Sequence, residues 1–180
     1  MLAAGVRIVQ YRNKSGVDHL LVRELRARAS RSDAFLIVND DLEAGLEADG
    51  FHAGQEDLAR LDPRRVRERL GARLFGVSCG TPAEARSATQ AGADYLGVGP
   101  FAPTSTKSDA GPPLGEAGLR AVAAASPLPV AAIGGITRSD LPALVRAGAR
   151  MAAVVSAIAR APDPEAAARE LIAAWAELAG

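Results

Sequence analysis

The sequence predicts an α/β fold of the TIM type, a (β/α)8 barrel that lacks its first strand and most of its first helix. Three observations support this prediction. Short apolar runs alternate with longer amphipathic segments throughout the 180 residues, as expected of parallel strands covered on both faces. At several junctions a helical segment ends on Ala or Gly and the next apolar run follows at once. Seven strand–helix units can be counted, whereas a closed barrel has eight.

The predicted strands are the apolar runs, and their near-continuous hydrophobicity indicates burial from both sides. The first run is preceded by MLAAG, which resembles the last turn of a helix without the strand that should come before it. In chain order the strands are expected at residues 6–11, 35–38, 50–53, 74–77, 95–98, 130–133 and 151–155.

The predicted helices are the amphipathic segments between these strands. Capping residues mark where three of them begin, namely Thr81, Thr137 and Asp163. The alternative fold is a doubly wound open sheet, which is disfavoured because no Gly-x-Gly-x-x-Gly motif opens any helix. The helices are expected at residues 17–29, 42–48, 64–70, 82–91, 116–124, 138–147 and 164–178.

Length and composition predict one domain, residues 1–180, and exclude several classes of function. A formal net charge of zero gives no electrostatic basis for a nucleic-acid or anionic-membrane partner. The sequence shows neither a signal peptide nor an apolar run that could span a bilayer. The single cysteine, Cys79, suits a reducing compartment, so we expect a cytoplasmic protein.

Polar residues gather at the carboxyl ends of the predicted strands, where parallel α/β folds bind their ligands. Each has an ordinary alternative, because Asn and Asp can cap the next helix and charged residues are mostly solvated anyway. A site is favoured because every strand carries such residues at the same end. In chain order they are Gln10, Arg12, Lys14, Asn39, Asp40, His52, Gln55, Asp57, Ser78, Thr104, Thr106, Lys107, Gly134, Gly135, Val155 and Ser156.

The two lysines indicate a site for anions. Of the 21 basic residues only Lys14 and Lys107 are lysine, and both follow predicted strands. A compact ammonium group can approach phosphate oxygens where a planar guanidinium is too large. Gly134, Gly135 and Ser156 lie where helices are expected to begin, so their backbone N–H groups could hold a phosphate.

Asp40 and Asp57 are carboxylates in a predicted site that is otherwise cationic, and binding of Mg²⁺ would explain their presence there. Mg²⁺ takes one or two carboxylates, keeps several waters and bridges phosphate oxygens. A zinc site is disfavoured because the chain has only two histidines and one cysteine. Together with Arg12, Lys14 and Lys107, the two carboxylates predict a clamp for a pyrophosphate group. His52 is expected to pack or to support a neighbouring side chain rather than to react.

Seven segments occur in an order that resembles the thiamine-phosphate synthase family, and they cover nearly the whole chain. The most specific are the Gln-x-Arg-x-Lys and Thr-x-Thr-Lys patterns. The resemblance implies a transferase that joins a hydroxymethylpyrimidine diphosphate to a thiazole phosphate and releases pyrophosphate. The segments are VQYRNK, VNDD, ADGFHAGQEDL, GVSCGTPAEA, GADYLGVGPFAPTSTK, IGGI and VVSAI.

The resemblance also implies roles for individual residues. The pyrimidine diphosphate would be bound by Gln10, Arg12, Lys14, Asn39, Ser78 and Lys107, of which Arg12, Lys14, Ser78 and Lys107 would act in catalysis. Asp40 and Asp57 would hold Mg²⁺. The thiazole phosphate would be bound by Thr104, Thr106, Gly135, Val155 and Ser156. The implied mechanism is dissociative, with diphosphate leaving before the thiazole nitrogen captures the pyrimidine methylene cation.

Two other functions stay open. The related thiazole tautomerase lacks Thr-x-Thr-Lys and relies on a histidine near the position of Ser78, whereas this chain has Gly80 there. A barrel without its first strand could also be a non-catalytic binder of phosphorylated ligands. The missing strand leaves the segments at 6–11 and 151–155 as unpaired edges, which a second copy of the chain could cover in a homo-oligomer.

Overall fold

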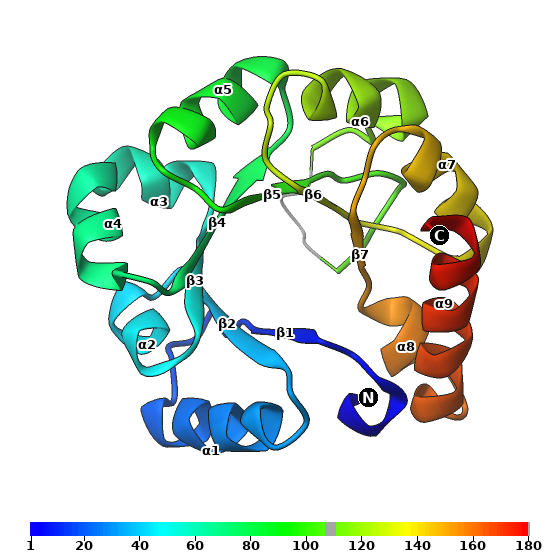
Figure 1. The fold of residues 1–180 in the computed structure, drawn as a ribbon, viewed down its shortest axis with the longest axis horizontal. Helices are drawn as coiled ribbons and strands as arrows, with labels where there is room; N and C mark the ends of the chain where they lie inside the picture. The colour runs from blue at the N-terminus through cyan, green and yellow to red at the C-terminus, as the bar shows by residue number, and fades with distance from the viewer. Residues whose placement is uncertain (107–110, 180) are drawn as a thin grey trace.

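The computed structural model describes residues 1–106 and 111–179, in which parallel strands form a ring with helices around its outside (Figure 1). The strands pair in chain order and every neighbouring pair is parallel. This confirms the barrel and overturns the doubly wound alternative, whose strand order reverses partway. The strands are β1 (Ile8–Tyr11), β2 (Phe35–Asn39), β3 (Gly50–Ala53), β4 (Leu74–Cys79), β5 (Tyr95–Val98), β6 (Val130–Ile133) and β7 (Met151–Ala153).

Helices follow the strands and cover the outer face of the ring (Figure 1). Thr81 caps α5 as predicted, because its side chain accepts a hydrogen bond from the Glu84 N–H. The helices are η1 (Leu2–Ala4), α1 (His19–Ser30), α2 (Leu42–Glu47), α3 (Gln55–Arg60), α4 (Pro63–Leu70), α5 (Pro82–Gln90), α6 (Gly115–Ala123), η2 (Arg138–Asp140), α7 (Leu141–Arg146), α8 (Ser156–Ala159) and α9 (Pro164–Ala179).

The structure departs from the predicted elements at several points along the chain. Helix α3 was not predicted, and α8 begins at Ser156, where a helix was expected to start, but its range was not among those predicted. The segment at 138–147 divides into η2 and α7, because Pro142 has no N–H to donate to the carbonyl of Arg138. The strands β1 and β7 are shorter than predicted, and each of them pairs with one neighbour only.

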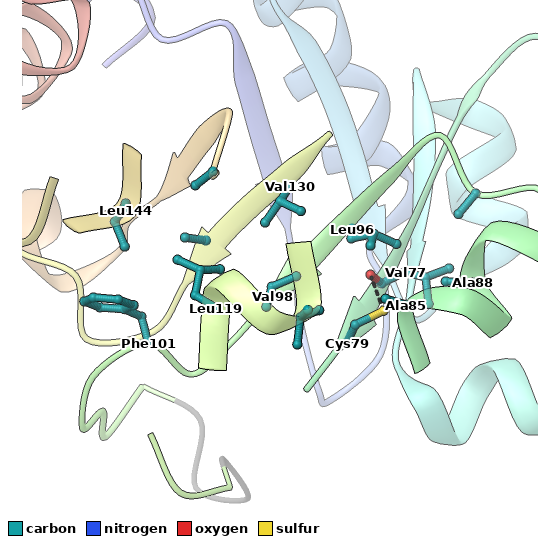
Figure 2. Close-up of a cluster of buried hydrophobic side chains, with 14 of the residues drawn as sticks. Val77, Cys79, Ala85, Ala88, Leu96, Val98, Phe101, Leu119, Val130 and Leu144 are labelled. Carbon is teal, nitrogen blue, oxygen red and sulfur yellow. Dashed lines mark hydrogen bonds between the residues drawn. The ribbon is translucent and has the colours of Figure 1, made fainter. Parts of the chain in front are cut away.

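The main core lies between the strands and the outer helices. Leu96 and Val98 of β5 are fully buried and pack with Ala85 and Ala88 of α5 and Leu119 of α6 (Figure 2). A smaller cluster lies under α1 and α2 and includes Val22, Leu36, Val38 and Ala44. Since side chains alternate along a strand, the residues between these core positions face the interior of the ring.

The ring is open between its two outer strands. Within the described residues β1 does not pair with β7, although η1 contacts α9 in the helical layer. Three apolar residues that face the interior are strongly exposed near this opening: Ile8 is 42% exposed, Phe35 51% and Ile133 38%. We call this opening, with these three residues, the seam. Among the described helices, none is both long enough and apolar enough to cross a membrane.

Candidate active site

The register of the sheet brings the predicted site residues to one rim of the barrel. Asn39 at the end of β2 is paired with His52 of β3, and Ser78 of β4 is paired with Gly97 of β5. Ile133, the last residue of β6, is paired with Ala153 of β7. Residues that follow these positions therefore leave the sheet at the same end. Lys107 lies outside the described residues, so its predicted role stays a prediction.

The carboxylates of Asp40 and Asp57 face each other at this rim. A Cβ atom at Gly54 would lie 3.1 Å from Oδ2 of Asp57 and 4.0 Å from Oδ1 of Asp40, so both groups border the same glycine. Burial raises the pKa of Asp40, and hydrogen bonding and charge repulsion from Asp57 raise it further, whereas Arg12 and Asn39 act in the opposite direction. Two adjoining carboxylates form a favourable place for a cation.

Cationic residues from the loop after β1 adjoin this carboxylate pair. Nε of Arg12 lies 3.8 Å from Oδ2 of Asp40. Lys14 lines a hollow of about 360 Å³ beside Asp40 and Asn39. The sequence-predicted residues Arg12, Lys14, Asn39, Asp40 and Asp57 therefore form one cluster at the ends of β1, β2 and β3. We call it the charged cluster.

The ordinary capping explanation fails for Asp40 but holds for Asp57. Helix α2 is capped by Asp41, whose Oδ1 accepts a hydrogen bond of 2.9 Å from the N–H of Ala44. Asp40 itself has a left-handed backbone with a φ of 66°, which Asp tolerates better than most residues. Asp57 is the third residue of α3, and its Oδ2 accepts a hydrogen bond of 3.3 Å from the N–H of Gly54.

A second group of predicted residues lies on the other side of the rim. The segment after β5 is tied to the end of β6, because Phe101 N donates to Ile133 O at 2.8 Å and Ala102 N to Gly134 O at 3.0 Å. Gly135 approaches this segment so closely that a Cβ atom there would lie 2.5 Å from Pro103 O. Thr104 follows directly, so it and Gly135 are held together.

The remaining residues of this second group are Thr106, Val155 and Ser156, which follow β5 and β7. Thr106 N–H donates a hydrogen bond of 3.2 Å to Oγ1 of Thr104, which folds the two threonines into one turn. Ser156 begins α8, and Val155 before it is exposed. Gly134 and Gly135 both have a positive φ and form the turn that leads into η2, which begins at Arg138, the predicted start of the helical segment. We call Thr104, Thr106, Gly135, Val155 and Ser156 the loop cluster.

A buried chain of polar side chains crosses the barrel interior below the rim. Nδ1 of His52 lies 2.9 Å from the hydroxyl of Tyr95, and its Nε2 lies 2.9 Å from Oγ of Ser78. Burial lowers the pKa of His52 to about 4, so the imidazole is neutral. Burial raises the pKa of Tyr95, while a side-chain hydrogen bond with Gln10 acts in the opposite direction. His52 therefore supports Ser78, as the sequence predicts.

Sequence reasoning missed Tyr95 and its connection to His52, although glycines gave a signal. His52 and Tyr95 occupy β3 and β5, and the residue between them in β4 is Gly76. A Cβ atom at Gly76 would collide with both rings, and one at Gly97 would lie 2.9 Å from Cε1 of His52. A glycine inside a strand marks a close approach by another group. Gln55 was predicted to lie at the same end of the barrel, but the sequence does not predict its partner: its Nε2 donates a hydrogen bond to the carbonyl of Ser78.

Cys79 does not supply a nucleophile to this rim. Its side chain faces the outer core rather than the interior, and Sγ contacts Val77 O at 3.8 Å (Figure 2). Burial raises the pKa of its thiol to about 12, so the reactive thiolate is scarce at neutral pH. The chemistry that the rim can offer is binding of anions and of a cation.

Comparisons with known proteins agree with this geometry. A family model described as thiamine monophosphate synthase matches residues 1–158. The thiamine-phosphate synthase of Geobacillus kaustophilus is 45% identical over 179 residues, which cover 94% of this chain and 80% of that protein. That of Methanoregula boonei is 47% identical over 176 residues, with the same two coverages of 94% and 80%.

Solved structures give the same result. Thiamine phosphate pyrophosphorylase from Pyrococcus furiosus superimposes with a TM-score of 0.86 at 30% identity, covering 99% of this chain and 87% of that one. A 3-hexulose-6-phosphate synthase, with a TM-score of 0.72 at 20% identity, shows the shared fold alone. With the matched family model and the curated relatives, these likenesses show that the chain belongs to the thiamine monophosphate synthase family.

Proposed function

We propose that this chain catalyses the synthase reaction itself, joining a hydroxymethylpyrimidine diphosphate to a thiazole phosphate with release of pyrophosphate. The observation that carries the proposal is the charged cluster, in which Arg12 and Lys14 adjoin the carboxylates of Asp40 and Asp57. Adjacent cations and carboxylates suit a diphosphate held together with a divalent cation. Curated relatives over 40% identical to the chain are named for this activity.

The residues of the charged cluster fit Mg²⁺. The carboxylates of Asp40 and Asp57 would hold it, and a bound cation would relieve the repulsion that raises the pKa of Asp40. Within the described residues no cluster of three or more His, Cys, Asp or Glu side chains could hold a metal, which argues against an all-protein cage. Mg²⁺ needs few protein ligands and, when bound, neutralises charge on phosphate oxygens.

The reaction then proceeds in two steps. The bond between the pyrimidine methylene carbon and the diphosphate oxygen breaks, and its electron pair leaves with the diphosphate. Arg12 and Lys14 stabilise that leaving anion, and Lys107 is assigned to it as well. The thiazole nitrogen next donates its lone pair to the methylene cation and forms the new C–N bond.

The loop cluster is assigned to the thiazole phosphate. Thr104 and Thr106 offer hydroxyl groups, and the glycine turn of β6 keeps Thr104 close to Gly135. Phosphates are bound in proteins by such hydroxyls and by backbone N–H groups. The charged cluster and the loop cluster follow different strands of one rim, so each substrate has its own set of residues.

A direct assay tests this proposal. The chain is incubated with both substrates and Mg²⁺, and we expect thiamine phosphate and pyrophosphate in equal amounts. Thiazole isomerisation without coupling would favour the tautomerase instead. Binding of the pyrimidine diphosphate by calorimetry without any turnover would favour the non-catalytic binder.

The metal assignment has a test that does not depend on activity. The variants Asp40→Asn and Asp57→Asn should each weaken Mg²⁺ binding in the presence of pyrophosphate by at least about tenfold, since each removes one charged ligand. Glu24→Gln, an exposed carboxylate on α1, is the matched control and should bind as the wild type does. Unchanged affinity in both aspartate variants would overturn the assignment.

Two further assignments belong to this proposal. Lys107→Ala should weaken diphosphate binding strongly while the circular-dichroism spectrum stays unchanged, and equal affinity by calorimetry would count against its role.

Within the described residues β1 and β7 each have one unpaired edge, which leaves room for a second copy of the chain. Light scattering tests the homo-oligomer, and a monomer at all concentrations would contradict it.

A further inference from the structure

We propose that Gln55 is a positioning residue for the divalent cation, because it anchors the first turn of α3 to β4 and so fixes where the carboxylate of Asp57 lies relative to Asp40. The side chain of Gln55 is half-buried, and its Nε2 donates a hydrogen bond to the carbonyl of Ser78. This inference rests on the proposed function, in which Asp40 and Asp57 hold the cation. Gln55 is not a ligand in that assignment and acts on the cation through Asp57.

Helix α3 is too short to fix its own orientation. It has six residues, Gln55–Arg60, and begins one residue after the end of β3, with Gly54 at its N-cap. Helices of this length are marginal in water and depend on contacts with the rest of the fold. Leu58 and Leu61 pack against the main core, but they lie beyond the first turn. A contact at the first turn is therefore needed to place Asp57.

The acceptor of the Gln55 hydrogen bond is a fixed point in the sheet. Ser78 belongs to β4, which is paired with β3 on one side and with β5 on the other. Its Oγ lies 2.9 Å from Nε2 of the buried His52. The main chain and the side chain of Ser78 are thus both held, so its carbonyl is a rigid acceptor. The amide that donates to it restrains Gln55 and, with it, the start of α3.

The two carboxylates are carried by segments that are anchored separately. Oδ2 of Asp57 accepts a hydrogen bond of 3.3 Å from the N–H of Gly54, the residue before Gln55. Asp40 has its own anchor in β3, because its N–H donates to the carbonyl of His52 at 3.0 Å. A movement of the first turn of α3 therefore changes the distance between the carboxylates. Because their charges repel each other, a turn without its anchor would move away from Asp40.

Mg²⁺ is more sensitive to this distance than Ca²⁺ is. Mg²⁺ demands a near-ideal octahedron with oxygens at about 2.0–2.1 Å, whereas Ca²⁺ accepts about six to eight oxygens at about 2.3–2.6 Å in flexible arrangements. Loss of the anchor should therefore weaken Mg²⁺ binding more than Ca²⁺ binding. A substitution that merely unfolded part of the chain would weaken the binding of both ions equally, so the difference between the ions separates positioning from a general loss of structure.

Metal titration of the chain without substrates tests the anchor. Binding of Mn²⁺, which prefers similar octahedral oxygen sites, is followed by the loss of its free-ion EPR signal, and Mg²⁺ and Ca²⁺ are added as competitors. Gln55→Met keeps the length of the side chain and removes the donor. It should weaken Mg²⁺ binding about five- to tenfold and Ca²⁺ binding less than about twofold. Gln90→Met, the matched control, makes the same exchange at an exposed position of α5 and should bind both ions as the unmodified chain does.

Asp57→Asn, titrated in the same way, shows whether the ions occupy the assigned site. If Asp57→Asn weakens binding and Gln55→Met does not, this inference is wrong and the metal assignment stands. If Asp57→Asn binds as the unmodified chain does, both are wrong. Equal weakening of Mg²⁺ and Ca²⁺ in Gln55→Met would also overturn the positioning role. If circular dichroism shows that Gln55→Met does not fold, Gln55→Asn, whose amide is one methylene shorter, takes its place with the same expected difference between the ions.

Turnover gives a second readout. In Gln55→Met the Mg²⁺ concentration at half-maximal rate should rise about five- to tenfold, while the rate at saturating Mg²⁺ stays within about twofold of the wild type, because the bound ion draws the two carboxylates back together. A lower rate at every Mg²⁺ concentration with an unchanged half-saturation would overturn the positioning role. A chain that shows the expected difference between the ions but no turnover defeats the proposed reaction alone.

Discussion

The two sides of the barrel interior use the same architecture in different ways. In the sector formed by β3, β4 and β5, His52, Ser78 and Tyr95 face inward, and their polar atoms bond one another. At the seam between β1 and β7, the inward residues Ile8 and Ile133 are apolar and 42% and 38% exposed. The same alternation of side chains produces a satisfied polar interior in the sector β3–β5 and an exposed apolar one beside the opening of the ring.

The difference between the sector β3–β5 and the seam indicates which part of the fold tolerates substitution least. In the sector β3–β5, helices cover the outer face of the sheet and inward side chains fill the other face. A substitution that adds or removes atoms there therefore alters contacts with close neighbours. At the seam the apolar side chains are partly exposed, so solvent can fill the space that a smaller side chain leaves. The sector β3–β5, which carries His52, Ser78 and Tyr95, should therefore be the part of the fold that tolerates substitution least.

The largest effect is expected when one apolar residue is shortened in each region and the two losses of stability are compared. Leu96→Ala removes a fully buried side chain of β5 and should lower the free energy of unfolding by about 3 kcal/mol. Ile133→Ala at the seam should cost about 1 kcal/mol, because its side chain is already partly solvated. Urea unfolding of both variants measures the contrast. Equal losses would show that the seam is as enclosed as the core.

Acid should destabilise the enclosed sector through His52. Its pKa is about 4 in the folded chain, whereas an exposed histidine titrates near about 6.5. Between these values the unfolded chain holds a proton that the folded chain lacks, so stability is present above about pH 6.5, declines as the pH falls to about 4 and then levels off. The decline attributable to His52 is about 3 kcal/mol at most.

Urea unfolding across this pH range measures the decline, and His52→Gln is the control that should remove it. The groups that contact the imidazole, Tyr95 and Ser78, are uncharged at these pH values, so they do not add a titration of their own. A wild type whose stability falls no faster than that of His52→Gln would show that the imidazole is protonated inside the fold.

A smaller effect tests how tightly the imidazole ring of His52 is packed. Gly97→Ala places a methyl group 2.9 Å from Cε1 of His52 and should cost about 2 kcal/mol of stability. Gly80→Ala, also next to the rim, is the matched control, since its new methyl group would meet ordinary contacts of 3.6 Å and 3.9 Å. Thermal unfolding of the two variants is compared. If Gly97→Ala is as stable as Gly80→Ala, the imidazole has room to move.

The smallest effect belongs to the seam itself. Ile8→Thr keeps a β-branched residue on the edge strand β1 and should change the free energy of unfolding by less than about 0.5 kcal/mol. Urea unfolding of this variant beside the wild type provides the measurement. A loss of 2 kcal/mol or more, well above the expectation of about 0.5, would mean that something covers Ile8 in solution, and light scattering would then show whether it is a second copy.

The parts of the fold that could be predicted are those set by neighbouring residues. The strands β3, β5 and β6 have the predicted bounds, because an apolar run between turn residues specifies a buried strand locally. The range of helix α8 could not be predicted, although its start at Ser156 was expected, since four residues are too few to show a helical period. Helix α3 left a weaker signal, because glycine is accepted at the N-cap position and Glu56 and Asp57 are acidic residues in the first turn.

The charged cluster could also be predicted, because parallel strands carry the residues after them to the same edge. Arg12, Asn39 and Asp40 each follow an apolar run, so their meeting at one rim follows from the order of the strands alone. The residue that caps α2 could not be predicted, since Asn39, Asp40 and Asp41 are all good caps and only the structure shows that Asp41 performs this role.

The sequence alone determined the class of fold, the rim on which ligands bind and the residue types available there. The apolar runs and their order along the chain can be read directly from neighbouring residues. Only the tertiary structure decided that His52 meets Tyr95, which lies 43 residues away, and that Asp40 faces Asp57. It also decided how far the inward side chains beside the predicted open edge at β1 are exposed. These outcomes depend on curvature, on side-chain rotamers and on the space that Gly76 and Gly97 leave empty, none of which a pattern of neighbouring residues encodes.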